Sequence, residues 1–258
     1  MVKPEPGDKQ NAVAVEQTED GLLNGRLRLR QNADGYRAGV DAAMLAAACD
    51  AKPGQRVLDA GCGVGAVMLQ AAFRRPGAAF IGVERDPSAI ELAVENIALN
   101  DLQDRVSVSA GEVSARPGPF AAAFDQVLAN PPFFDDPGAI RGPSPEKRGA
   151  WLADGGLPAW TEFVTKAVRE GGSVILIHRA DRLGELLALL ARRAGSFQVR
   201  AVYPFADAPA SRILVRAVRA GRAPLKLLPP LVLHPREGAK HTPEAEAILR
   251  GEASVTWD

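Results

Sequence analysis

An amide, two prolines and an aromatic ring stand together at Asn130-Pro131-Pro132-Phe133. They follow an apolar run, Phe124 to Ala129, that is typical of a buried strand. Neither proline has an N–H to donate to a sheet or a helix, so these residues predict a stiff loop that presents carbonyl oxygens. Such a loop can hold a planar ligand through its amino group. Open α/β sheets bind their ligands just beyond the carboxyl ends of the strands, which is where this loop would lie.

A second candidate ligand loop is the glycine-rich segment Asp59 to Gly65, between a predicted strand and a predicted helix. Glycines allow the backbone to turn sharply there and to approach a ligand closely. The segment also satisfies the dinucleotide pattern G-x-G-x-x-A, and Glu84 lies 23 residues beyond Gly61, close to the spacing in NAD-binding proteins. One hypothesis is therefore a nicotinamide-dependent oxidoreductase.

Two features favour a different ligand. Asp59 would attract an ammonium group and repel a pyrophosphate. The Asn-Pro-Pro-Phe segment would also have no role in an enzyme that transfers hydride. S-adenosylmethionine carries an ammonium, a ribose and an adenine, so we expect Glu84 to bind the two ribose hydroxyls and Glu112 the adenine amino group. Asp59 could instead cap the helix that follows it. The residues predicted to bind the cofactor are Asp59, Gly61, Gly63, Gly65, Glu84, Arg85, Glu112 and Asn130.

Alternating strands and helices position both loops. Apolar runs predict strands at 56–60, 79–84, 106–110, 124–129 and 173–178, with helices at 65–75, 87–100, 161–170 and 182–194. Strands at 199–203 and 212–218 follow one another without a helix, which predicts an antiparallel pair. The order predicts an α/β fold with a doubly wound, mainly parallel, seven-stranded sheet that contains one antiparallel strand.

Composition limits the class of protein. The chain has 258 residues, 47% of them hydrophobic, and a formal net charge of zero, so no global field attracts it to nucleic acid. It lacks a signal-peptide pattern and a run of roughly 20 apolar residues that could span a membrane. Cys49 and Cys62 argue against a disulfide framework, and we expect a cytoplasmic protein. The three histidines have no metal spacing, so no metal site is expected.

The two loops, with Glu84 and Glu112, resemble the class I, Rossmann-like methyltransferases that methylate amino groups with S-adenosylmethionine. Three further segments resemble more closely the bacterial tRNA (adenine-N6) methyltransferases that act beside a valine-tRNA anticodon. They are Gly35 to Asp41, Asn130 to Asp135 and Thr242 to Gly251. The resemblance runs from about residue 21 to residue 251 and implies tRNA as the partner and adenine N6 as the acceptor.

Under this interpretation, the Asn130 side-chain carbonyl and the Pro131 backbone carbonyl each accept one N–H of the acceptor amine. Phe133 would stack on the base, which must leave its own stack to reach the pocket. The predicted catalytic residues are Asn130, Pro131, Pro132 and Phe133.

The expected domain organisation has three parts. Residues 1–20 are predicted to be a disordered tail, and residues 21–222 a class I methyltransferase domain with an N-terminal strand and helix extension. Residues 223–258 are predicted to form a C-terminal tail packed on the domain. Within the domain, residues 135–158 are typical of a long mobile loop.

Basic residues suggest where RNA would bind. Arg26, Arg28 and Arg30 fall on one face of a strand predicted at 25–31, and Arg141 and Arg148 lie in the loop after the Asn-Pro-Pro motif. Further arginines between residues 200 and 226 fit phosphate binding and a solvated strand face equally well.

Other functions stay open from the residues alone. The same pocket suits the amide of a protein glutamine or the amino group of a ribosomal RNA guanine. An oxidoreductase, or a cofactor-binding module without activity, are less favoured alternatives.

Overall fold

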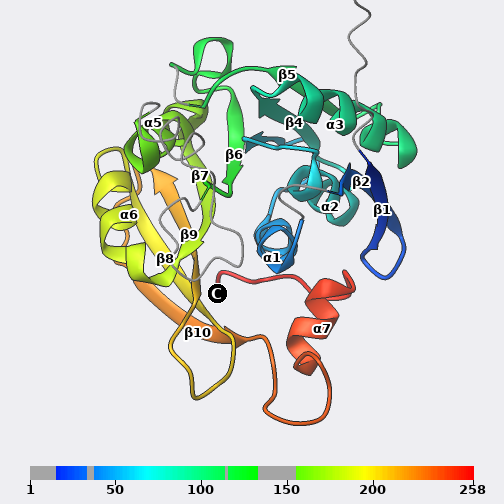
Figure 1. Cartoon of the computed structure of the whole chain (residues 1–258). Coiled ribbons are helices and arrows are strands. Elements are labelled where there is room, and N and C mark those ends of the chain that lie inside the picture. Colours follow the sequence, from blue (N-terminus) through cyan, green and yellow to red (C-terminus); the bar gives the residue numbers. More distant parts are fainter. Residues whose placement is uncertain (1–15, 34–37, 114–115, 133–154) are drawn as a thin grey trace, which may run out of the picture.

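The computed structural model describes residues 16–33, 38–113, 116–132 and 155–258. Within these ranges, eight strands form one sheet in the order β10-β8-β9-β7-β6-β3-β4-β5. Figure 1 shows this sheet curving through the molecule from β5 to β10. The strands are β3 Arg56–Ala60, β4 Ala79–Glu84, β5 Val106–Ala110, β6 Phe124–Ala129, β7 Val168–Arg179, β8 Ala194–Tyr203, β9 Arg212–Arg219 and β10 Lys226–Val232.

The predicted fold class is confirmed. β9 runs antiparallel to both of its neighbours, β7 and β8, and the remaining neighbours in the sheet pair in parallel. The sheet has one strand more than predicted because β10 joins it beside β8. Pro229 and Pro230 lie within β10, and an edge strand tolerates prolines, since one side of its backbone needs no partner.

Helices cover both faces of the sheet (Figure 1). On one face lie α1 Val40–Ala48, α2 Ala66–Arg74 and α3 Pro87–Leu99; on the other lie α5 Gly156–Ala167 and α6 Leu183–Leu190. Each face has its own buried cluster, with Met68 and Phe80 in the first and Phe124 and Phe163 in the second. Burial on both faces explains why successive residues of β3 and β6, Val57–Leu58 and Val127–Ala129, are apolar.

Two predicted boundaries change in the structure. α5 begins at Gly156, inside the segment predicted to be a mobile loop, and ends at Ala167. The strand that follows starts early, at Val168, because Val168 already pairs with Phe124 of β6 before a shift in register. The predicted start of α3 is correct: Asp86 is its N-cap and accepts the Ser88 N–H at 2.9 Å, with Pro87 in the first turn.

An N-terminal hairpin lies outside the main sheet. β1 Gln17–Leu22 pairs antiparallel with β2 Leu27–Asn32, so the predicted disorder of residues 1–20 is wrong for residues 17–20. Residues 1–15 lie outside the described ranges. In β2 the buried residues alternate with the arginines, as the period-two pattern predicts.

The C-terminal segment is part of the core. α7 Pro243–Leu249 packs near α1, and the last residues run back along α1. Val255 donates its N–H to the Ala47 carbonyl at 3.0 Å, and the Trp257 indole N–H donates to the Ala48 carbonyl at 2.9 Å. Residues 223–258 therefore supply a strand and buried side chains to the domain, beyond the packed tail that the sequence suggests.

None of the helices in the described ranges is both long and apolar enough to cross a membrane.

Candidate functional site

The register of three neighbouring strands brings the candidate loops together. Ala60, the last residue of β3, pairs with Val83 of β4 on one side and with Ala129 of β6 on the other. Gly61, Glu84 and Asn130 follow or end these strands, so all three lie at the same carboxyl edge of the sheet. This is the position at which open α/β sheets bind ligands.

The glycine loop has the backbone of a close-approach site. Gly61, Gly63 and Gly65 have φ values of +69°, +53° and +91°, a region that favours glycine. The loop is held from β4: the Gly61 and Cys62 N–H groups donate to the Val83 carbonyl at 2.9 and 3.0 Å. A fixed loop without β-carbons at three positions, just before the N-terminus of α2, fits the cofactor predicted from the sequence.

Glu84 organises this loop. Its Oε2 accepts the Gly63 N–H at 3.0 Å, and its Oε1 accepts the N–H groups of Arg85 and Asp86 at 2.8 and 3.0 Å. A carboxylate has about four acceptor positions, so roughly one remains for a ligand. The bidentate contact to two ribose hydroxyls that we predicted would therefore require Glu84 to release a backbone N–H.

Asp59 lies beneath the loop, in contrast to the ligand-facing position predicted for it. Only 2% of the residue is exposed, and its Oδ2 accepts the Met68 N–H of α2 at 3.1 Å. Burial raises the pKa of its carboxyl to about 7, with a further contribution from Glu84, while the Met68 N–H opposes the shift. The side chain thus fulfils the alternative role, that of an acceptor for the first turns of the helix.

Arg85 and Glu112 form an exposed pair beside the loop. Arg85 Nη1 lies 3.3 Å from Glu112 Oε1, across the ends of β4 and β5. Their backbones are also joined, because Gly111 donates its N–H to the Glu84 carbonyl at 2.9 Å. Glu112 is therefore at the rim of the edge where the cofactor's adenine is expected.

The Asn-Pro-Pro loop begins directly after β6. Asn130 and Pro132 are half-buried, and Pro131 is buried. Phe133, the predicted stacking residue, lies outside the described ranges, as do Arg141 and Arg148.

Two site-forming residues were missed by the sequence analysis. Trp160 of α5 lies against Gly61, with its Cη2 atom 2.4 Å from the place a β-carbon would occupy. Asn96 of α3 is fully buried and donates to the Val64 carbonyl in the glycine loop at 3.0 Å. A tryptophan and an asparagine within helical patterns give no local signal, because their contacts depend on how the helices pack.

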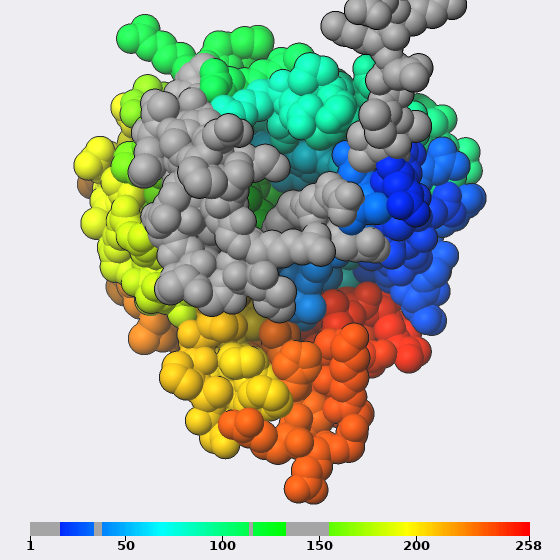
Figure 2. Space-filling model, in the orientation of Figure 1, coloured from blue at the N-terminus to red at the C-terminus, as the bar shows by residue number. Residues whose placement is uncertain are grey.

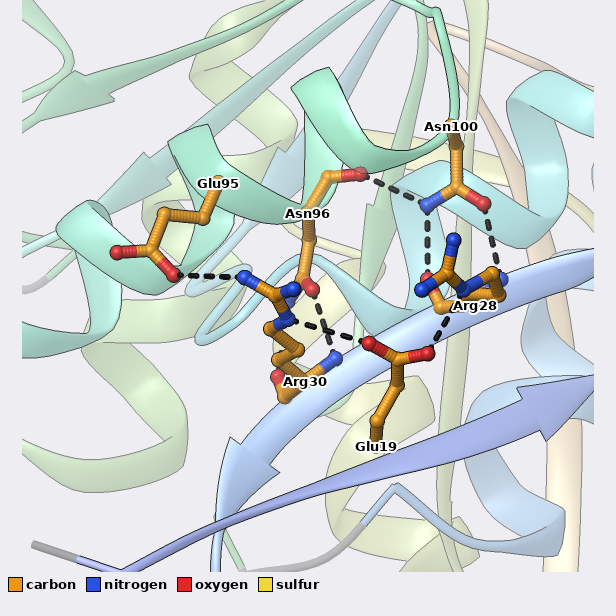
Figure 3. Close-up of polar contacts among 6 residues, drawn as sticks. All are labelled: Glu19, Arg28, Arg30, Glu95, Asn96 and Asn100. Atoms are coloured by element: carbon orange, nitrogen blue, oxygen red, sulfur yellow. Dashed lines mark hydrogen bonds and ion pairs between the residues drawn. The ribbon is translucent and has the colours of Figure 1, made fainter.

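The hairpin arginines differ in their surroundings. Arg26 precedes β2, donates to the carbonyls of Leu23 and Arg250, and covers the Phe73 ring. Arg28 and Arg30 have 54% and 41% of their side chains exposed, and their guanidinium groups contact the Glu19 carboxylate, whereas Arg26 is held by backbone carbonyls and a ring (Figure 3). Arg28 and Arg30 are therefore the better placed to meet a phosphate.

The arginines between residues 200 and 226 mostly make internal contacts. Arg200 is buried and donates to the carbonyls of Pro229 and Thr256. Arg212 pairs with Asp41 at 2.9 Å, and Arg219 donates to the carbonyls of Lys166 and Val168. These contacts favour a structural role for the arginines of this segment over phosphate binding and over a solvated strand face.

The cysteines and histidines lie in structural settings. Both thiols are free and buried, and burial raises the pKa of each, to about 12 for Cys49. The loops after β8 and β10 meet at one end of the molecule (Figure 2), where the His234 and His241 rings stack 5.0 Å apart. The described part of the chain contains no cluster of three or more residues suited to a metal ion.

The fold, with two loops at the carboxyl edge of its sheet, is that of the class I methyltransferases. Residues 37–140 match the family model described as the methyltransferase small domain. The chain thus contains a methyltransferase domain, as the sequence resemblance implies.

Curated relatives carry more specific names. A tRNA1(Val) (adenine(37)-N6)-methyltransferase of Dyadobacter fermentans is 27% identical over 86% of this chain and 92% of its own length. One of Haemophilus influenzae is 28% identical over 59% of this chain, and the match spans just under two thirds of that protein, 65%. A release factor glutamine methyltransferase of Salmonella typhimurium is 32% identical over 54% of this chain and 52% of its own length.

Solved structures share the fold. A predicted O-methyltransferase from Agrobacterium tumefaciens superposes with a TM-score of 0.70 at 24% identity, covering 83% of this chain and 98% of that one. A 16S rRNA guanine-N2 methyltransferase from Thermus thermophilus superposes with a TM-score of 0.54 at 20% identity, covering 79% of this chain and 50% of that one.

Proposed function

We propose that this enzyme methylates the exocyclic N6 of an adenine in tRNA. The observation that carries the proposal is the pairing of Ala60 with Ala129, which sets the Asn-Pro-Pro loop beside the glycine loop. The Dyadobacter relative, matched over nearly its whole length, supports adenine N6 of tRNA as the acceptor. An enzyme that acts on tRNA would work in the cytoplasm.

The chemistry follows from what the chain offers next to the glycine loop. S-adenosylmethionine, when bound, supplies an electrophilic methyl carbon. The lone pair of an adenine amine is conjugated with the ring and is therefore a weak nucleophile. Asn130 Oδ1 and the Pro131 carbonyl would accept the two N–H groups, hold the amine in place and favour a pyramidal nitrogen. The amine proton would become acidic only as the methyl passes from sulfur to nitrogen, with the methyl–sulfur bond breaking as the C–N bond forms, and the proton would then leave to solvent. Positioning is therefore the main contribution of the protein.

The glycines and Glu84 are proposed to hold the cofactor. Gly63 would admit it close to the backbone, Gly61 and Gly65 would provide the turns on either side, and Glu84 would fix the loop and offer its remaining acceptor position. Arg85, Glu112 and Asn130 would line the rim, and Asp59 would act indirectly through α2.

Substitution of Asn130 tests the mechanism. We expect Asn130→Ala to lower the rate of methyl transfer to tRNA by roughly 10²-fold or more, because the amine loses one of its two positioning contacts. The dissociation constant for S-adenosylhomocysteine, measured by calorimetry, should stay within about threefold of wild type. Methyl transfer near the wild-type rate would rule the mechanism out.

The acceptor is tested separately with the wild-type enzyme. Three substrates are each incubated with the enzyme and S-adenosylmethionine: a valine tRNA transcript, a ribosomal RNA fragment and a release factor protein. The products are identified by mass spectrometry. We expect N6-methyladenosine in the tRNA. Methylguanosine in the ribosomal RNA, or methylglutamine in the release factor, would assign the same chemistry to a different acceptor.

A further inference from the structure

Trp160 lies against Gly61 at the carboxyl edge of the sheet. It is in the first half of α5, the helix that packs against β6 and β7. Its side chain is partly buried against the apolar cluster on that face of the sheet. The indole reaches the glycine loop from the α5 side, whereas the Val83 carbonyl and Glu84 hold the same loop from β4.

The contact with Gly61 is close. A β-carbon at Gly61 would lie 2.4 Å from Trp160 Cη2 and 3.3 Å from both Cζ2 and Cζ3. No side chain could be placed there unless the indole moved. Gly63 is different: it shares the positive φ, but a β-carbon there meets no described atom within 4 Å. The indole therefore covers the start of the loop and leaves its middle open.

We propose that Trp160 is a positioning residue of the cofactor site, which fixes Gly61 and forms an aromatic wall beside the sulfonium group. Gly61 follows Ala60, and Asn130 follows Ala129, the residue paired with Ala60. Methyl transfer between these two loops must bring the sulfonium to this point. An indole there suits a cation, because the face of an aromatic ring attracts positive charge.

The first test compares two ligands that differ in charge at sulfur. Trp160→Ala should weaken binding of S-adenosylmethionine by roughly 3- to 30-fold, the range expected for loss of a cation–π contact. Binding of S-adenosylhomocysteine, whose sulfur is neutral, should weaken by no more than about threefold. Trp160→Phe should restore most of the difference. Calorimetry gives both constants without any RNA.

The matched control is Trp257→Phe, which changes a tryptophan that is buried against α1. It should leave the ratio of the two dissociation constants unchanged. Equal weakening of both ligands in Trp160→Ala, or no weakening, would overturn the proposed contact with the sulfonium.

The second test concerns the contact with Gly61 itself. Gly61→Ala adds a clash with Trp160 to the backbone strain of a positive φ, whereas Gly63→Ala adds only the strain. Trp160→Ala should therefore recover part of the thermal stability lost in Gly61→Ala and none of that lost in Gly63→Ala. Equal recovery in both, or recovery in neither, would show that the indole does not fix the loop.

The inference rests on the cofactor and is independent of the proposed tRNA acceptor. Failure of the wild-type protein to bind either ligand would count against the cofactor, whereas normal wild-type binding with unaffected Trp160 variants would count against Trp160 alone.

Discussion

Asp59 and His178 are buried side chains that both favour their neutral forms. Burial raises the pKa of Asp59 to about 7 and lowers that of His178 to about 4, because a low-dielectric interior disfavours charge of either sign. The stability of the fold therefore depends on pH in opposite ways at these two residues. Asp59 also shows what a sequence leaves undetermined, since a carboxylate at a strand end can face a ligand or cap the next helix.

Asp59→Asn should change the pH dependence of stability. Between about pH 4 and 7 the folded state keeps a proton on Asp59 that the unfolded state releases, so wild-type protein loses stability as pH rises through this window. Asparagine can still accept the Met68 N–H and does not titrate. The stability of the variant relative to wild type should therefore increase by up to about 4 kcal/mol from pH 4 to pH 7.5, measured by urea unfolding.

His178→Gln serves as the opposite control. The folded-state pKa of His178 lies below its usual value, so wild-type protein gains stability from this residue as pH rises from about 4 to 6.5. The glutamine variant should lose that gain. A constant difference between Asp59→Asn and wild type across the pH range would show that Asp59 stays ionised in the fold.

At the level of elements, the hairpin depends on two asparagines of α3. Asn96 accepts the Arg30 N–H at 2.7 Å and donates to the Arg30 carbonyl at 2.9 Å, and Asn100 repeats this pattern with Arg28 (Figure 3). One helical turn thus places two side-chain amides where a neighbouring strand would place backbone groups. Asn96 alone also reaches the glycine loop, through Val64.

Removing these amides should have unequal effects. Asn96→Ala leaves three backbone groups without their partner in a buried place, so we expect a loss of roughly 2–4 kcal/mol in the free energy of unfolding. Asn100→Ala, at a more exposed position, should cost about 1 kcal/mol. Only Asn96→Ala should also weaken binding of S-adenosylhomocysteine. Equal effects of the two variants on ligand binding would exclude a link between the hairpin and the glycine loop.

The elements that the sequence predicts well are those with local signals. The parallel strands, the glycine loop and the capped start of α3 each follow from apolar runs, glycines, or an aspartate before a proline. β1 and β10 escape prediction because an acidic strand and a strand with two prolines gain stability only from their partners. The same holds for Trp160 and Asn96, whose contacts with the glycine loop arise from helix packing.

At the scale of the whole molecule, the net charge is zero, so attraction of RNA depends on where the positive side chains lie. Arg28 and Arg30 lie on the hairpin that Asn96 joins to the glycine loop, so a bound RNA could reach them and the site together. Both currently share Glu19, at 2.7 and 3.2 Å. Exposed pairs of this kind add little stability, so their guanidinium groups can exchange a carboxylate for a phosphate at small cost.

The salt dependence of RNA affinity tests this surface. Removing two phosphate contacts with Arg28→Ala/Arg30→Ala should reduce the slope of log affinity against log salt by roughly 1–2, whereas Glu19→Gln should strengthen binding. Lys52→Ala/Arg222→Ala is the matched control. Lys52 precedes β3 and Arg222 follows the antiparallel strand β9, so both lie at the edge of the sheet opposite to the carboxyl ends of the parallel strands. Filter binding to tRNA at several salt concentrations measures each slope. If both double variants change the slope equally, the attraction comes from overall charge and the hairpin has no special part in it.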